Sequence, residues 1–377
     1  MITTYFRSSS LGGLDFCEQK YFLDYVLGLD STSNQKADKG TILHKVMEVL
    51  AIAKKTLDTC TDEIVVLNED IGEVIVKRSE FLKEKIWSEL EVDYINKCRK
   101  SKTIFVTKCD ITYGHKSYGV DLVNEVIDKS YKYYVEKFSH HNWTNIDLRD
   151  ITNWVYMALD YSHGQFDPRR CDILEPEQKF DIVIDKPWAE YEFSHKGQIL
   201  RGKLAIKGTI DLIIKTNKDT IECRDWKSGS RKAWASKDLH TKDLADFQKD
   251  QQLMLYYYAI RKLYPQFPSV ILTIFYVRDG GPFSVCFDDD TLLQVEDNLK
   301  NKFEYVKNTT LPKMLSPSQT DFKCTKLCHF YKNDWSGTNK NQCRFIHDQI
   351  QNIGIDAVTE KYKNPNFEFG KYKAPGT

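Results

Sequence analysis

The stretch CRDWKSGS, residues 223–230, sets an acid and an ammonium group two positions apart just ahead of a glycine. Side chains alternate along a β-strand, so Asp225 and Lys227 project from the same face if this stretch ends a strand. A surface ion pair would explain the two charges, but such pairs add little to stability. The meaning of the stretch therefore depends on the residues that lie beside it.

The preceding segment, KLAIKGTIDLIIK at residues 203–215, supplies a second acid. Its alternation predicts a strand with Asp211 on one face. The other face carries the apolar residues Leu204, Ile206, Ile210, Leu212 and Ile214. A hairpin over TNKD, residues 216–219, would set Asp211 beside Asp225, and two converging carboxylates repel unless a cation neutralises them. Oxygen ligands suit Mg²⁺ or Mn²⁺, so we predict a metal site here, with Lys227 directed at the ion's water or at a phosphate.

The overall composition indicates a folded protein without a strong global charge. The 377 residues include 54 basic and 54 acidic side chains, so any basic surface that binds nucleic acid must be local. The 41% hydrophobic content favours a globular core, and no segment approaches the roughly 20 apolar residues of a membrane span. The N-terminal MITTYFRSSS lacks the apolar centre of a signal peptide. We expect a cytoplasmic protein with no membrane contact.

Hydrophobic periodicity divides the chain. It predicts helices over 8–29 and 41–57, helical segments from 58 to 170, and a sheet that begins at 173, where the period changes to two. We predict an α/β protein made of N-terminal helices (1–57), a large helical insertion (58–170), a core of sheet and helices (171–310), a cysteine-rich segment packed on the N-terminus (311–350), and a tail (351–377) that is loosely ordered from about residue 355.

Four motifs in order carry a resemblance. GTID at 208–211, followed after a turn by DWKSG at 225–229, resembles the core of the PD-(D/E)XK nuclease superfamily. The branch that it resembles holds the RecB and AddB nuclease domains and the iron–sulfur nucleases of the CRISPR-associated and exonuclease V types. GTILH at 40–44 is similar to that branch's G-T-x-x-H motif, and Gln252 with Tyr256 is similar to its Q-x-x-x-Y helix. The resemblance covers roughly 8–50 and 173–345. It implies a restriction-endonuclease-like core, in which helices flank a mixed central sheet.

The resemblance also implies roles for single residues. The implied metal ligands are His44, Asp211, Asp225 and the backbone carbonyl of Trp226. Lys227 would orient or deprotonate the attacking water, while Gln252 and Tyr256 would order the site or touch DNA. Glu177 resembles an acid that supports the ligands in this branch. Glu48 is a further supporting candidate, although at i+4 it could simply satisfy His44.

The ten cysteines fall into two groups. Six are scattered singly and fit free thiols, namely Cys60, Cys98, Cys109, Cys171, Cys223 and Cys286. The other four resemble the family's iron–sulfur ligands, namely Cys17, Cys324, Cys328 and Cys343. The family's C-terminal spacing is C-x2-C-x5-C, whereas this chain has C-x3-C-x14-C. We expect a structural [4Fe-4S] cluster; a zinc site that includes His329 or His347, or free thiols, are the alternatives.

These features together predict a metal-dependent deoxyribonuclease. By resemblance we expect an exonuclease on single-stranded or end-processed DNA, acting in replication, recombination or repair. The chain has no G-x-x-x-x-G-K-[ST] motif, so a helicase or recombination protein would be a partner. The alternative is a nuclease fold kept for DNA binding or assembly without catalysis. That alternative predicts a damaged acid site, whereas the acids of this chain are intact.

Overall fold

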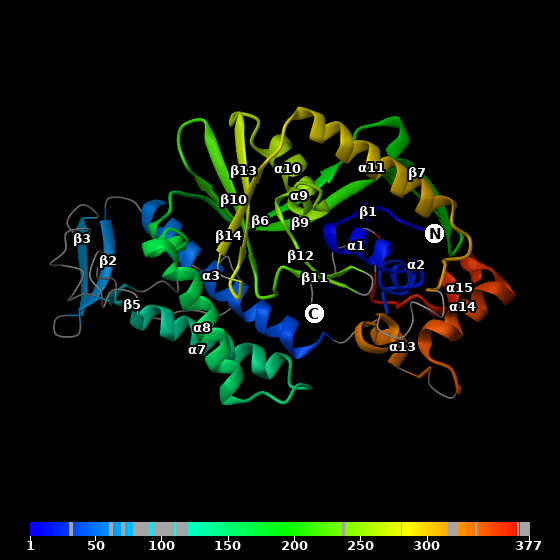
Figure 1. The fold of residues 1–377 in the computed structure, drawn as a ribbon, viewed down its shortest axis with the longest axis horizontal. Helices are drawn as coiled ribbons and strands as arrows, with labels where there is room; N and C mark the ends of the chain where they lie inside the picture. Colours follow the sequence, from blue (N-terminus) through cyan, green and yellow to red (C-terminus); the bar gives the residue numbers. More distant parts are fainter. Residues whose placement is uncertain are drawn as a thin grey trace.

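A mixed β-sheet with helices on both faces forms the centre of the computed structural model (Figure 1). The structure describes residues 1–29, 33–59, 63–68, 72–77, 91–92, 109–110, 120–235, 238–279, 281–315, 323–332, 334–335, 338–367 and 369. The strands are β1 (Tyr5–Phe6), β2 (Glu63–Asn68), β3 (Gly72–Lys77), β4 (Glu91–Val92), β5 (Cys109–Asp110), β6 (Ile173–Val183), β7 (Glu190–His195), β8 (Gln198–Lys203), β9 (Ala205–Lys215), β10 (Thr220–Lys227), β11 (Lys232–Ala235), β12 (Asp238–Thr241), β13 (Ser269–Tyr276) and β14 (Gly281–Cys286). The α-helices are α1 (Ser8–Phe16), α2 (Glu18–Tyr21), α3 (Gln35–Thr59), α7 (Val120–Lys137), α8 (Asn145–Leu159), α9 (Leu244–Gln248), α10 (Gln251–Leu263), α11 (Asp289–Asn308), α13 (His329–Lys332), α14 (Gln342–Ile353) and α15 (Ile355–Tyr362). Shorter turns of 3₁₀ or π geometry are η1 (Phe22–Val26), η3 (Tyr161–Gly164), η4 (Pro168–Arg170), η5 (Pro187–Ala189) and η6 (Lys323–Leu327).

The central sheet has the order β1-β9-β10-β13-β14, and β6 also pairs with β9. β10 is antiparallel to β9 and parallel to β13, so the sheet is mixed, as predicted. β6 pairs with β9 from Ala205 to Ile214, which leaves the other edge of β9 to two strands. β1 pairs there with Ala205 and Ile206, and β10 pairs with residues 212–215. Residues 207–211 therefore lie where β1 and β10 part.

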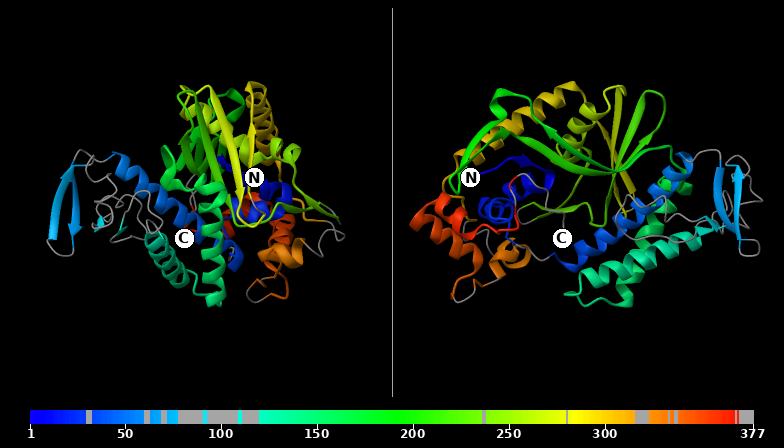
Figure 2. Two further views of the ribbon diagram at one scale, coloured as in Figure 1. Left: turned by 60° about the vertical axis from the view of Figure 1, so that its left-hand side comes forward. Right: turned by 180° about the vertical axis from the view of Figure 1, so that it is seen from behind.

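Two hydrophobic cores cover the two faces of the sheet. On one face, Cys223 and Leu272 pack with Leu253 of α10 in a core that also includes α11 and the N-terminal helices. On the other face, Trp226 and Phe275 pack with α3, α7 and α8. Figures 1 and 2 show α3, α7 and α8 together on one side of the sheet, away from α11. The predicted α/β arrangement of helices around a mixed sheet is confirmed.

The segment 58–170 differs from the predicted helical insertion. Residues 63–68 and 72–77 form the antiparallel pair β2 and β3, as their β-branched sequences EIVVLN and GEVIVK favour. The helical prediction is therefore wrong there. Helices α7 and α8 close the second face of the sheet, because Val126 and Val155 belong to the same core as Trp226. Much of 78–119 lies outside the described residues, and the division of the chain into segments stays a prediction.

The prediction that Leu204 to Ile214 share one apolar face is wrong at its second half. Ile206 and Ile210 belong to the core beneath α10, whereas Leu212 and Ile214 pack with Ala51 of α3. The alternation shifts around Asp211. Directly across the β6–β9 ladder at this point, Glu177 has a φ of 49°, so the strand is irregular where the acid lies.

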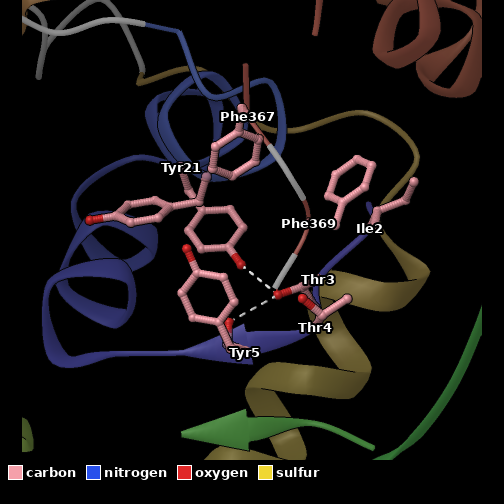
Figure 3. Close-up of a pocket in the computed structure, with 8 residues that line it drawn as sticks. Ile2, Thr3, Thr4, Tyr5, Tyr21, Phe367 and Phe369 are labelled. Atoms are coloured by element: carbon pink, nitrogen blue, oxygen red, sulfur yellow. Dashed lines mark hydrogen bonds between the residues drawn. The ribbon is translucent and has the colours of Figure 1, made fainter. Parts of the chain in front are cut away.

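The C-terminal segment packs on the N-terminus. α15 buries Ile355 and Val358, and the backbone N–H of Asn364 donates to the carbonyl of Leu27 at 2.8 Å. Figure 3 shows Phe367 beside Tyr21 in a small pocket behind β1. The prediction of a loosely ordered tail is therefore wrong through residue 367, because its aromatic residues pack into this region. Among the described residues, none of the helices is long and apolar enough to cross a membrane.

Gly28 tests this packing. It has a φ of 63°, and a Cβ there would overlap the ring of Phe367. We predict that Gly28→Ala lowers the free energy of unfolding by about 3 kcal/mol, because backbone strain and overpacking each contribute ~1–3 kcal/mol. The matched control is Gly354→Ala, at a φ of 84° with nothing within 4 Å, which adds strain alone. Equal losses for the two variants in denaturant unfolding would contradict the proposed contact.

Candidate active site

The site lies where β9 and β10 separate. The ladder between them ends at the pair Leu212 and Arg224, so Asp211 and Asp225 are the next residues along each strand. The backbone N–H of Trp226, which has left the ladder, donates to Asp211 Oδ2 at 2.8 Å. A carboxylate thus takes the place of the missing strand carbonyl. This bond holds the two acids together at the fork of the sheet.

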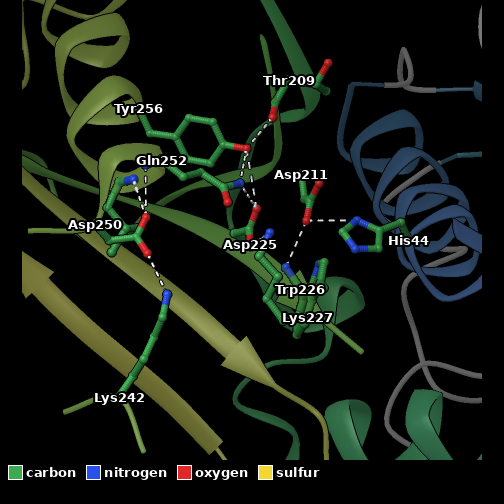
Figure 4. A network of polar contacts seen from close by, with 11 residues as sticks. His44, Thr209, Asp211, Asp225, Trp226, Lys227, Lys242, Asp250, Gln252 and Tyr256 are labelled. Carbon is green, nitrogen blue, oxygen red and sulfur yellow. Dashed lines mark hydrogen bonds and ion pairs between the residues drawn. The ribbon is translucent and has the colours of Figure 1, made fainter. Parts of the chain in front are cut away.

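His44 reaches the fork from α3. Its Nδ1 lies 3.1 Å from Asp211 Oδ2 (Figure 4). Burial lowers the pKa of His44, but Asp211 and Asp225 outweigh burial and hold that pKa above its usual value. Burial raises the pKa of Asp211, and His44 outweighs it, so the net shift is downward. Both shifts favour the form of the pair in which an imidazolium faces a carboxylate.

The helix motif of the sequence contacts the second acid. Gln252 Nε2 donates to Asp225 Oδ1 at 2.7 Å and lies 2.7 Å from Tyr256 Oη. Tyr256 Oη donates to the carbonyl of Thr209 at 2.7 Å. Gln252 lies in the first turn of α10, where Asp250 accepts hydrogen bonds from the helix's N-terminal N–H groups. The i, i+4 spacing thus places both side chains on one acid, as Figure 4 shows.

Lys227 pairs with the other oxygen of the same acid. Its Nζ lies 2.6 Å from Asp225 Oδ2, and its side chain is 31% exposed against 4% for Asp225. Burial lowers the pKa of Lys227, but Asp225 and Asp211 raise it by more, so the amine is an ammonium ion. Burial, together with Asp211, raises the pKa of Asp225 despite Lys227. One side of Lys227 thus faces the opening of the site.

Glu48 and Glu177 form a separate pair of acids beside this group. Glu48 contacts Lys45 and Glu177, while His44 contacts Asp211, so Glu48 does not satisfy His44 at i+4. Burial and the neighbouring Glu177 raise the pKa of Glu48 to about 7. Glu177 holds a left-handed backbone next to Asp211, a conformation that is rare for a side chain of this kind. Support of the metal ligands by these two acids stays a prediction.

The donor set fits a hard divalent ion. Asp225 Oδ2 is buried and, within the described part of the chain, receives no well-oriented hydrogen bond, although Lys227 is its ion-pair partner. The donor atoms are carboxylate oxygens, the type that Mg²⁺ and Mn²⁺ prefer, together with one imidazole nitrogen. Among the described residues, the ligand atoms of His44, Asp211 and Asp225 do not all lie within 4.8 Å of one another, so their side chains would have to rotate to hold one ion. The backbone N–H of Trp226 donates to Asp211, and its indole ring is buried in the hydrophobic core.

The structure explains why residue 40 is a glycine, which the sequence alone did not. A Cβ on Gly40 would lie 2.5 Å from Ser228 Oγ, directly after the strand that carries Asp225 and Lys227. The absence of a side chain at residue 40 lets α3 approach this strand end without displacing the Ser228 hydroxyl. The helix was predicted to begin at residue 41, whereas α3 begins at Gln35, so Gly40 lies inside the helix and its close approach to the strand was missed.

The four cysteines of the predicted cluster come together at the other side of the molecule. Cys17 lies between α1 and α2, Cys324 in η6, Cys328 just before α13 and Cys343 in α14. Burial raises the pKa of Cys343, and the other three cysteines raise it further, so all four lie in one group. Among the described residues, no three of these sulfur atoms close to within 4.8 Å of one another. A tetrahedral zinc ion with Zn–S bonds of about 2.3 Å would hold sulfur atoms roughly 3.8 Å apart.

Contacts from the same segment tie the two ends of the chain together. The backbone N–H of Gln19 donates to the carbonyl of Lys313 at 3.2 Å, and Gln19 Nε2 donates to the carbonyl of Cys343 at 3.4 Å. His347 Nδ1 lies 3.4 Å from Gln19 Oε1. The cysteine-rich segment therefore packs on the first helices, next to Cys17.

Comparison with known proteins identifies the family but no specific relative. A model of the PD-(D/E)XK nuclease superfamily matches residues 120–330, which includes α7 and α8. Among solved structures, the chain is similar to a "Putative exonuclease" from Eubacterium rectale, with 7% identity, 52% of this chain and 68% of that chain covered, and a TM-score of 0.32. It is also similar to the structure described as SSO0001, with 18% identity, 47% and 70% coverage, and a TM-score of 0.21. No curated protein matches the chain. Because the family model matches more than half of its residues, the chain belongs to the PD-(D/E)XK nuclease superfamily.

Proposed function

We propose that this nuclease hydrolyses phosphodiester bonds of DNA in a metal-dependent reaction, on single strands or strands with free ends. The observation that carries the proposal is the meeting of His44, Asp211, Asp225 and Lys227 at the fork of β9 and β10. The two acids and the histidine suit a bound cation. The cation and the partly exposed ammonium group of Lys227 in turn suit a phosphate substrate, which carries negative charge. A role in replication, recombination or repair, with a helicase or recombination protein as partner, stays a prediction.

His44, Asp211 and Asp225, with the carbonyl of Trp226, are the proposed ligands of Mg²⁺ or Mn²⁺. When bound, such an ion supplies a Lewis acid for the phosphate and lowers the pKa of water. Gln252 and Tyr256 are positioning residues. They hold Asp225 Oδ1 by hydrogen bonds, which leaves Oδ2 to face Lys227 and the ion.

Lys227 is proposed to orient the attacking water and to stabilise charge on the phosphate. An ammonium group donates hydrogen bonds and has no lone pair with which to abstract a proton. Its raised pKa therefore favours stabilisation of charge over action as a base. The 31% exposure of its side chain leaves donors for a substrate oxygen.

An open cleft of about 480 Å³ beside the site is the proposed path of the strand. It is lined by Gln35, Lys36, Lys39, Asp147, Asp150, Trp154 and Arg278. The cleft adjoins the fork, because the N–H of Val277 donates to the carbonyl of Lys227 at 3.1 Å and Arg278 follows directly. Lys39 is held by Asp147 and Asp150, so Lys36 and Arg278 are the cations proposed to bind phosphates.

The four grouped cysteines are proposed to hold a [4Fe-4S] cluster with a structural role. Cys17, Cys324 and Cys328 lie near enough to Cys343 to raise its pKa, and four thiolates in one group can hold such a cluster. The segment that carries three of them already packs on the first helices through Gln19. A cluster there would fasten the two ends of the chain to each other.

Substitution of the site tests catalysis. Asp225→Asn and Lys227→Ala should each lower the rate of DNA hydrolysis at least ~100-fold with the fold intact, because the first weakens a proposed metal ligand and the second removes a cation from the phosphate's surroundings. End-labelled single- and double-stranded DNA with Mg²⁺, with Mn²⁺ and with a chelator provides the measurement. Lys218→Ala, an exposed lysine at the far end of β10, is the control that should keep the wild-type rate.

Two outcomes would overturn this assignment. A full rate in Lys227→Ala would remove Lys227 from the reaction. A wild-type protein that binds DNA but cleaves neither substrate with either ion would favour a non-catalytic binding or assembly module.

Charge removal in the cleft tests the strand path. We predict that the double variant Lys36→Ala/Arg278→Ala raises KM for single-stranded DNA about tenfold at low salt, with kcat nearly unchanged. The effect should shrink as salt rises, since phosphate contacts are screened. In the matched double variant Lys218→Ala/Lys262→Ala, Lys218 lies in the turn before β10 and Lys262 in the last turn of α10, and neither constant should change. Equal KM values in the two double variants would contradict the path.

The colour of anaerobically purified protein tests the cluster. Wild type should be brown and contain iron, and Cys343→Ser should lose both the visible absorbance and the iron. Cys286→Ser, at an exposed cysteine away from the group, should keep them. A colourless wild type with one bound zinc would contradict the cluster and restore the zinc alternative.

A further inference from the structure

A second group of metal-ligating side chains lies where α3 begins. Asp38, in the first turn of α3, meets His140 and His141, which lie in the turn between α7 and α8. His141 Nε2 is 2.6 Å from Asp38 Oδ2, and the three side chains offer ligand atoms that all lie within 4.8 Å of one another. Within the described residues, no other three His, Cys, Asp or Glu side chains bring their ligand atoms within 4.8 Å of one another.

We propose that Asp38, His140 and His141 form a transition-metal site of the zinc class. Two imidazoles and one carboxylate are a donor set for Zn²⁺, Co²⁺ or Ni²⁺, whereas Mg²⁺ prefers oxygen alone. Bonds of about 2.0–2.2 Å place tetrahedral ligands roughly 3.3 Å apart. One pair of ligand atoms is 2.6 Å apart and all three lie within 4.8 Å of one another, so modest side-chain rotations would close the site. Water fills the fourth position.

Neighbouring residues fix the orientation of the Asp38 carboxylate, and the exposed His140 leaves the site open to an ion from solvent. Asp38 is 3% exposed, and Ser33 Oγ donates to its Oδ2 at 2.6 Å. The ring of His141 packs edge-on against Trp143, whose Nε1 donates to the carbonyl of Phe138 at 3.0 Å. His140 is exposed, so an ion can enter from solvent and bind it last.

The site is separate from the acids at the fork and does not rest on the proposed function. Asp38 and His44 are six residues apart on α3, about 9 Å along a helix axis. The ion would join the α7–α8 turn to the start of α3, where Gln35 Nε2 already donates to the carbonyl of Asn142 at 3.1 Å. Its role would be to fasten the wall of the cleft, since Lys39 one residue on bonds Asp147 and Asp150 of α8.

Cobalt titration of the full chain tests the site. Excess Mg²⁺ is added to occupy the oxygen-rich fork, and Co²⁺ at cysteines is recognised by its sulfur-to-metal charge-transfer band. Wild type should take up one equivalent of Co²⁺ with visible d–d absorption and no such band, and Zn²⁺ should displace it. His140→Ala should bind this equivalent at least tenfold more weakly. His163→Asn, at another exposed histidine whose φ of 60° suits Asn, should bind it like wild type.

A second measurement guards against a folding defect. Because His140 is exposed, His140→Ala should unfold at the wild-type temperature without metal, and only wild type should gain stability when Zn²⁺ is added. Equal Co²⁺ uptake, or equal Zn²⁺ stabilisation, in wild type and His140→Ala would overturn the proposal and leave Asp38 and His141 as an ion pair.

Discussion

The hydrogen bond from the backbone of Trp226 to the carboxylate of Asp211 is the contact on which the site depends. It forms where the ladder of β9 and β10 stops, and it replaces a strand-to-strand bond with a bond to a side chain. Without it, a buried N–H would lack a partner and Asp211 would be free to turn away from Asp225. The separation of β9 and β10 and the approach of the two acids therefore have the same cause.

The two faces of the sheet supply different parts to this fork. α3 brings His44 to Asp211, and Gly40 lets that helix approach the end of β10. α10, from the opposite face, brings Gln252 and Tyr256 to Asp225. Each acid is therefore held by a different helix, and Lys227 is left between them and solvent. Movement of either helix would alter the distance between the carboxylates.

The sequence predicted these parts where the pattern was local and missed those set by distant contacts. Period-two alternation located β9 and β10, and the spacing of Gln252 and Tyr256 correctly indicated a shared partner in the interior. The change of face at Asp211 depends on the backbone of Glu177 across the ladder, which no pattern within β9 reveals. α7 and α8 read as an insertion because an amphipathic helix has the same period whichever surface it covers. His140 and His141 lie about a hundred residues from Asp38, so only the fold brings them together.

Manganese binding measured by titration calorimetry in two buffers of different ionisation enthalpy tests the central claim most directly. The pKa of His44 is raised in the metal-free protein, so a proton on its imidazole must leave when an ion binds there. The account predicts that wild type binds Mn²⁺ with net proton release near neutral pH, and that Asp225→Asn loses this binding. Binding of equal strength and equal proton release in Asp225→Asn would contradict it.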